Sequence, residues 1–284
     1  QSFDKLEIEA IEDDSASRSG HGAGNIIATI PGTVEGDYIY FTSHMDTVTP
    51  GVHIQPTLKE DGYIYSDGTT ILGADDKAGL AALFEMLEVL REQKIEHGPF
   101  QLVITAGEES GLRGAKAMDP TLLKADYGYA VDSTGKVGGI VNAAPYQTKI
   151  AVRIEGKTAH AGVAPEKGIS AITVAAKCVA EMQLGRIDDE TTANIGKFHG
   201  GEATNIVCDE VHILAEARSI NEQKMENQVT HMKETFERVA LENDAKAIVE
   251  TTRMYPGFSV QPTDRVIQTA SRAIHNIGRE VTVM

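Results

Sequence analysis

Three short motifs in the first half of the sequence combine residue types that bind metal ions and move protons. They are His44-Met45-Asp46, Asp75-Asp76 and Glu108-Glu109. Imidazole nitrogen and carboxylate oxygen suit zinc, or manganese or cobalt at a less selective site. Hydrolytic metal centres also need one acid that stays off the metal to move protons. The three motifs together predict a hydrolytic metal centre.

The first motif places His44 two residues before Asp46. Side chains two residues apart on an extended chain lie on the same side, so Asp46 can reach back to the imidazole. A carboxylate that holds one ring nitrogen fixes the tautomer and makes the other nitrogen a better ligand. By itself this spacing is equally typical of a surface turn.

The second motif, Asp75-Asp76, stands before a helical pattern over residues 77–91. A helix cap explains one acid at this position, because its carboxylate accepts from free backbone N–H groups. Two acids after Gly73 and Ala74 exceed what a cap needs. A carboxylate held at a helix start is also well placed to bridge two cations.

The third motif, Glu108-Glu109, follows a continuous apolar strand over residues 100–106. Adjacent residues project differently, so one glutamate can bind a metal while the other moves protons. The next strand, residues 127–131, is followed by Asp132. A single aspartate at a strand end is usually a turn former, so Asp132 counts only together with the others.

The elements that must position these residues alternate between strands and helices. Strands are predicted at 25–30, 38–43, 100–106 and 127–131, a hairpin at 54–66 and a helix at 77–91. This pattern predicts an α/β fold with a mixed, mostly parallel sheet flanked by helices. Ligands bind at the edge of such a sheet where strands end. All three motifs and Asp132 fall at that edge.

The pattern changes near Tyr146. The following residues predict strand, helix, strand, strand, helix and strand at 149–155, 169–183, 192–198, 206–217, 222–241 and 247–254. This order is ferredoxin-like. We expect an inserted α+β domain at residues 146–257. We expect residues 1–145 plus 258–284 to form the catalytic domain, with a helix at 264–277 and a strand at 280–284.

The net charge and the composition of the sequence exclude some classes of protein. The 284 residues carry a formal net charge of −16, which opposes binding to nucleic acid. No apolar run approaches the roughly 18 residues of a membrane span, so no membrane partner is expected. Cys178 and Cys208 lie far apart in the sequence. We expect both to be buried free thiols in a reducing, cytoplasmic compartment.

The combined motifs resemble those of the dizinc metallopeptidase family of carboxypeptidase G, succinyl-diaminopimelate desuccinylase and peptidase T. The likeness is greatest to the peptidase T (aminotripeptidase) branch, at residues 43–47, 72–79 and 107–111. The resemblance implies two zinc ions bridged by Asp75, a cis peptide bond after it, and the following roles. His44 and Asp132 bind one metal, Glu109 binds the other, Glu108 is the general base, and Asp46 orients His44.

The resemblance also assigns roles in the inserted domain. His160 would stabilise the oxyanion, in relatives often across a dimer interface, so the inserted domain would support a homodimer. Asn205 and Arg218 would contact the substrate. A guanidinium can bind a peptide carboxylate through two hydrogen bonds. The alternative for Arg218 is an ordinary surface salt bridge.

One part of the family pattern has no match. The second metal of the family takes a further histidine from a C-terminal segment, and no histidine follows His275, which lies in a predicted helix. Either the C-terminal part of the catalytic domain, with that histidine, follows Met284, or the second metal site is incomplete. The end of the sequence within a predicted strand favours the first alternative.

The implied function is hydrolysis of peptide bonds in short peptides by a hydroxide that bridges two metals, with Glu108 as base. Two alternatives stay open. An N-acyl-amino-acid amidohydrolase would use the same centre on acyl amides. A binding module derived from the enzyme would keep the fold without the catalysis.

Overall fold

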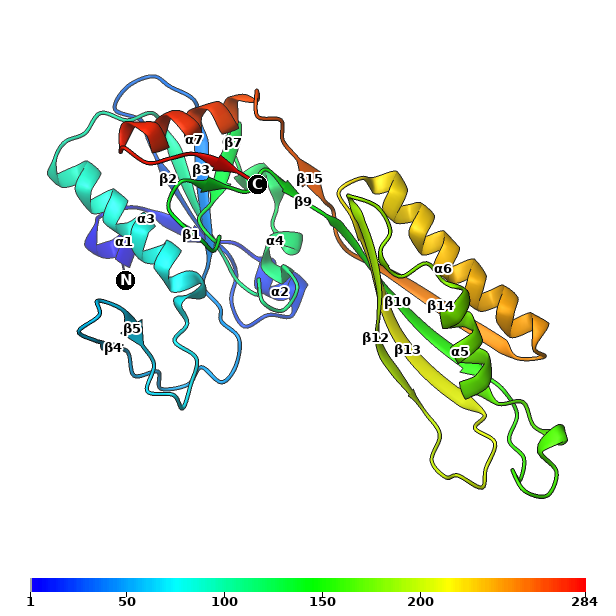
Figure 1. Ribbon diagram of the computed structural model, residues 1–284. Helices are drawn as coiled ribbons and strands as arrows, with labels where there is room; N and C mark the ends of the chain where they lie inside the picture. The colour runs from blue at the N-terminus through cyan, green and yellow to red at the C-terminus, as the bar shows by residue number, and fades with distance from the viewer. Residues whose placement is uncertain (1) are drawn as a thin grey trace. The chain divides into compact units, whose positions relative to one another are not determined.

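The computed structural model describes residues 2–284 and divides the chain into two compact units (Figure 1). The first unit ends at Lys136, and the second runs from Val137 to Met284. The discontinuous catalytic domain expected from the sequence stays a prediction. The candidate ligands and the candidate base all lie in the first unit.

The first unit is built on a five-stranded sheet in the order β1-β2-β6-β3-β7. Its strands are β1 (Ala10–Glu12), β2 (Ile26–Ile30), β3 (Ile39–His44), β6 (Phe100–Thr105) and β7 (Tyr127–Ala130). β3 pairs in parallel with β6 and β7, whereas β2 pairs antiparallel with β1 and β6. The predicted mixed sheet is confirmed, and each predicted strand is correct to within one residue at either end.

The long helix α3 (Ala74–Glu92) covers this sheet. Its Leu83 and Leu87 pack in one cluster with Phe100 and Leu102 from β6. Burial of a large apolar side chain contributes about 1.5–3 kcal/mol, so these contacts hold α3 against the sheet. The smaller elements are α1 (Ser2–Lys5), α2 (Ser15–Ser19), the hairpin strands β4 (Thr57–Leu58) and β5 (Ile64–Tyr65), α4 (Arg113–Ala117) and the 3₁₀ helix η1 (Pro120–Leu122).

The second unit has a five-stranded sheet in the order β11-β12-β13-β10-β14, with all pairs antiparallel. Its main elements are β10 (Tyr146–Glu155), α5 (Ala171–Glu181), β11 (Gly185–Arg186), β12 (Thr191–Gly200), β13 (Glu210–Ser219), α6 (Glu222–Glu242) and β14 (Lys246–Tyr255). Helices α5 and α6 lie on one face of the sheet (Figure 1). The predicted ferredoxin-like order is confirmed.

The predicted strand at 206–217 begins too early, because β13 starts only at Glu210. The preceding residues bond instead to the loop that carries His160. Val207 N donates to Ala159 O at 2.9 Å, and His160 forms an isolated bridge with Ile206. Periodicity could not detect this pairing, because it joins two loops about 45 residues apart in sequence.

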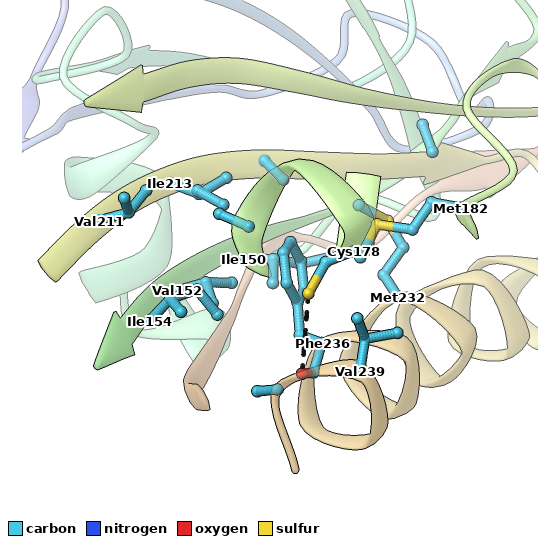
Figure 2. Packing of buried hydrophobic residues seen from close by; sticks show 14 of the residues in the cluster. Ile150, Val152, Ile154, Cys178, Met182, Val211, Ile213, Met232, Phe236 and Val239 are labelled. Carbon is cyan, nitrogen blue, oxygen red and sulfur yellow. Dashed lines mark hydrogen bonds between the residues drawn. The ribbon is translucent and has the colours of Figure 1, made fainter. Parts of the chain in front are cut away.

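The core of the second unit lies between the sheet and its two helices (Figure 2). Phe236 of α6 is fully buried and lies beside Cys178 of α5. Burial raises the pKa of the Cys178 thiol to about 11. Both cysteines are free, but Cys208 is only partly buried. The prediction of two buried thiols is therefore right for Cys178 and wrong for Cys208.

The other elements of the second unit are short apart from one helix. They are β8 (Gly139–Ile140), β9 (Ala143–Ala144), η2 (Pro165–Lys167), β15 (Phe258–Ser259), α7 (Arg265–Asn276) and β16 (Thr282–Val283). β16 pairs in parallel with β8, and β15 pairs antiparallel with β9. In residues 2–284, no helix is both long enough and apolar enough to cross a membrane.

Candidate metal centre

His44 is the buried centre of the candidate site. It is the last residue of β3, and its side chain is 2% exposed. Its Nδ1 lies 3.0 Å from the Asp46 carbonyl oxygen and 3.5 Å from the Asp46 carboxylate. The hydrogen bond to Asp46 thus goes to the backbone carbonyl, where the sequence had suggested the carboxylate. With Nδ1 bound in this way, Nε2 is left to face the other acids.

The Asp46 carboxylate has a different set of contacts. It accepts from Glu108 N at 3.0 Å and from Glu109 N at 3.1 Å. Burial by itself would raise the pKa of Asp46, but these two hydrogen bonds outweigh it and hold the pKa below its usual value. Asp46 therefore connects the histidine motif to the glutamate motif.

The Nε2 atom of His44 faces two carboxylates. Asp75 Oδ1 lies 2.8 Å away and Asp132 Oδ2 lies 3.7 Å away. Ligand atoms from these three residues all lie within 4.8 Å of one another. Three strand-end or helix-start residues, far apart in sequence, thus meet as one His-Asp-Asp set.

The two adjacent aspartates at the start of α3 make different contacts. Asp76 is 4% exposed, and its Oδ1 accepts from Gly79 N at 3.1 Å, which is a capping bond. Asp75 points to His44 instead. The peptide bond between the two aspartates is cis, as the resemblance implied. The capping explanation and the metal explanation thus each describe one of the two residues.

A second candidate set combines His44 with Glu108 and Glu109, again with ligand atoms within 4.8 Å. Burial raises the pKa of Glu108; the nearby acids Glu109, Asp132 and Asp46 raise it further, and His44 opposes them. A raised pKa suits a group that accepts and returns a proton near neutral pH. The distances alone do not assign one glutamate to the metal and the other to proton transfer.

The residues fit a divalent cation. Burial raises the pKa of Asp132, and repulsion from Asp76 and Asp75 adds to this effect. A cation among these carboxylates would remove that repulsion, and the nitrogen–oxygen donors suit zinc, manganese or cobalt. In the described part of the chain, residues 2–284, no set joins Asp75 to Glu109. The bridging of two metals by Asp75 stays a prediction.

The three candidate residues of the second unit fall at two places. His160 and Asn205 are exposed and neighbour each other, since Ala161 N donates to Asn205 O at 2.9 Å. Arg218 lies near the other end of β13 and donates to Glu216 at 2.7 Å. From Glu210 to Arg218 the strand rises about 26 Å. The structure therefore brings His160 and Asn205 together but keeps Arg218 apart from them.

Sequence reasoning missed Asn25, which is fully buried and accepts from Ala106 N next to the glutamate motif. One asparagine before a strand gives no signal that separates it from a turn residue. The pattern Gly24-Asn25 followed by an apolar strand was the only hint in the sequence.

The fold and the donor sets define a class: metal-dependent hydrolases with a mixed α/β sheet and a ferredoxin-like second region. Comparison with known families agrees. Residues 25–174 match the sequence model described as peptidase family M28, and residues 147–244 match the peptidase dimerisation domain of the M20 type. The two matches overlap at the beginning of the second unit.

Solved structures show a likeness over the whole chain. The aminopeptidase PepT from Bacillus cereus ATCC 10987 is 60% identical, with a TM-score of 0.96 over 99% of this chain and 76% of that chain. A tripeptidase from Staphylococcus aureus Mu50 is 50% identical, with a TM-score of 0.97 over 100% of this chain and 76% of that chain.

Curated relatives agree. The uncharacterised protein YqjE of Bacillus subtilis is 60% identical over 98% of this chain and 74% of its own length. Peptidase T of Escherichia coli K12 is 31% identical over 62% of this chain, and the matched part spans only 51% of that protein. The chain belongs to the metallopeptidase family that contains the PepT aminopeptidases and tripeptidases.

Proposed function

We propose that this protein hydrolyses peptide bonds in short peptides, as a tripeptidase or aminopeptidase with two zinc ions. The observation that carries the proposal is the meeting of His44 Nε2 with Asp75 and Asp132 beside the two glutamates. His44, Asp75 and Asp132 would hold one metal. Glu109, together with Asp75 as a bridge, would contribute to the second.

The chemistry divides between the metals and the protein. The metal ions, when bound, supply the Lewis acidity that lowers the pKa of water. Glu108 takes the proton of the attacking water on its carboxylate and later returns it to the leaving amine. Asp46 holds the backbone of Glu108 and Glu109 in place through its two accepted hydrogen bonds. The raised pKa of Glu108 supports its role as the base.

The second unit would supply substrate contacts from two subunits. A tripeptide extends for about 10 Å, far less than the rise of about 26 Å along β13 from Glu210, on the side of His160 and Asn205, to Arg218. Both residues of one subunit therefore cannot contact one bound peptide. In a homodimer formed through the second unit, His160 and Asn205 of one protomer would contact a peptide bound to the other protomer. The match to the M20-type dimerisation domain supports this arrangement.

Arg218 would bind the peptide carboxylate after exchanging part of its contact with Glu216. The Arg218 guanidinium donates to the Glu216 carboxylate through Nε at 2.7 Å and through Nη2 at 3.3 Å. Its Nη1 makes no bond to Glu216. A cytoplasmic location is part of the proposal, because both cysteines are free.

The test is a substrate comparison with zinc-loaded protein. Free tripeptides should be cleaved at least tenfold faster than N-acetyl or N-succinyl amino acids at equal concentration. Faster cleavage of the acyl amides would make the protein an amidohydrolase of the same family. Absence of all hydrolysis together with no bound metal after zinc loading would favour a binding module.

A further inference from the structure

The two glutamates lie on the segment that joins β6 to the first residues of α4, residues 107–114, named here the glutamate turn. Asn25 holds both ends of it from inside the first unit. Its Oδ1 accepts from Ala106 N at 3.2 Å, and its Nδ2 donates to Gly114 O at 3.0 Å. Ala106 is the residue before the turn, and Gly114 is its last residue. One buried side chain therefore connects the beginning of the turn to its end, in addition to the backbone hydrogen bonds from Arg113 N to Gly107 O and from Gly114 N to Ala106 O, both 2.8 Å.

Asn25 is itself fixed by two buried residues of the preceding segment. Its Nδ2 donates to Asp13 Oδ2 at 2.9 Å and lies 3.1 Å from Ser15 Oγ. Its backbone N donates to Asp13 Oδ1 at 2.8 Å. Burial would raise the pKa of Asp13, but hydrogen bonds from Ser15 and Asn25 outweigh it and lower the pKa. A charged acceptor in the interior thus locks the Asn25 amide in one orientation.

The two ends of the glutamate turn are closely packed. A Cβ on Gly114 would lie 2.3 Å from Asn25 Oδ1. At the other end, Gly107 has φ +69°, and a Cβ there would lie 2.8 Å from the ring of His21. His21 Nε2 is also 3.3 Å from Ser110 Oγ. The segment that holds Asn25 therefore contacts the turn at both glycines and in its middle.

We propose that Asn25, held by Asp13 and Ser15, is a positioning residue for the two catalytic glutamates. It fixes the glutamate turn at both ends, while Asp46 fixes the backbone N–H groups of Glu108 and Glu109 from the other side. This inference rests on the proposed peptidase function. Loss of the Asn25 amide would leave the metal residues His44, Asp75 and Asp132 in place, because they belong to other elements.

A purely structural role for Asn25 makes a different prediction, and Gln101 offers a matched control. Gln101 is also buried in the first unit and joins three groups by hydrogen bonds, namely Thr29, Leu122 and Lys124. It lies at the start of β6, whereas the glutamate turn follows the end of β6. The two residues thus share burial and several side-chain hydrogen bonds but differ in contact with the turn.

The experiment compares Asn25→Leu with Gln101→Leu. Both should lower the thermal unfolding midpoint, because each leaves buried backbone groups unpaired. Only Asn25→Leu should lower kcat, by about tenfold or more at unchanged KM, since small displacements of catalytic groups are costly. It should also change the visible spectrum of the cobalt-loaded protein and weaken cobalt binding at the second, Glu109-dependent site. Equal losses of kcat in both variants, or an unchanged kcat and spectrum in Asn25→Leu, would overturn the proposal.

A rescue pair keeps the test decisive if Asn25→Leu does not fold. Asn25→Asp alone places two carboxylates in buried contact and should lose activity and stability. Adding Asp13→Asn rebuilds a donor–acceptor pair between positions 13 and 25 and keeps an acceptor for Ala106 N, but Gly114 O stays without its donor. The double variant should therefore regain part of the unfolding midpoint, while kcat and the cobalt spectrum stay altered. Wild-type kcat and a wild-type spectrum in the double variant would contradict the role of Asn25 at both ends of the turn.

Cobalt spectra and affinities need no turnover, so the two proposals can fail separately. If the wild-type chain cleaves none of the tested peptides, the proposed function fails. A spectrum that differs in Asn25→Leu but not in Gln101→Leu would still support Asn25 as the positioning residue of the glutamate turn.

Discussion

The two units bury different kinds of side chain. The main apolar cluster of the second unit has 19 buried residues, and that of the first unit has seven. In residues 2–284, the buried Asp and His side chains are Asp13, His44 and Asp76, all in the first unit. The second unit has the larger apolar core, whereas the first buries the titratable groups that position the site. Loss of chemistry and loss of stability should therefore follow mutations in different units.

The largest expected effect is chemical and falls in the first unit. Glu108→Gln keeps the size of the side chain but removes the proton acceptor, so kcat should fall by about 10²–10⁴-fold. Metal content and the unfolding midpoint should stay close to those of the wild type. Steady-state kinetics and metal analysis of the same sample measure both. Near-normal turnover would remove Glu108 from the mechanism.

The next effect belongs to stability in the second unit. Phe236→Ala empties a fully buried position and should cost about 3–5 kcal/mol of unfolding free energy. Urea unfolding followed by circular dichroism measures it, since the chain has no tryptophan. Phe198→Ala, at a side chain 43% exposed, is the control and should cost about 0.5 kcal/mol or less. Similar costs for the two variants would show that the core of the second unit is not the source of its stability.

Removal of metal should change hydrogen exchange in the first unit and leave it unchanged in the second. Binding at 100 times the dissociation constant stabilises a folded state by about 2.7 kcal/mol, and a chelator removes this contribution. Hydrogen exchange should then speed up at the end of β3 and the start of α3. Amides of α5 and α6 should keep their protection. Equal loss of protection in both units would contradict the separation.

The smallest effect is a pH dependence in the first unit. The pKa of Asp13 is lowered in the folded state, so its contribution to stability is present above the unfolded value of about 3.8. That contribution is lost as the pH falls through the folded pKa. Asp13→Asn should therefore be less stable than the wild type at pH 6 and lose less stability between pH 5 and pH 3. Asp67→Asn, at an exposed turn residue whose pKa is also lowered, is the control and should change this pH profile less. A wild-type acid profile in Asp13→Asn would show that Asp13 does not set it.

The sequence was sufficient to predict the site residues that follow strand ends, but not the contacts that depend on long-range packing. His44, Asp75 and Asp132 were correctly expected to meet, because strands of one sheet end at one edge. The contacts of Asn25 reach residues 81 and 89 positions away, and no local pattern encodes them. Helices α2 and α4 have five residues each, too few to show a helical period. The separation of His160 from Arg218 appears only once the length of β13 is known.

The two glycines of the glutamate turn have a consequence for how this protein can vary. Gly114 has no space for a methyl group, and at Gly107, which has a positive φ, a Cβ would meet the ring of His21. The six residues between them are therefore bounded by two positions that accept only glycine. Mutation can exchange the exposed side chains of Ser110 and Arg113 inside this interval, while its length and its ends stay the same. A gene library that randomises Ser110 and Arg113 should yield many folded variants, whereas one that randomises either glycine should yield almost none.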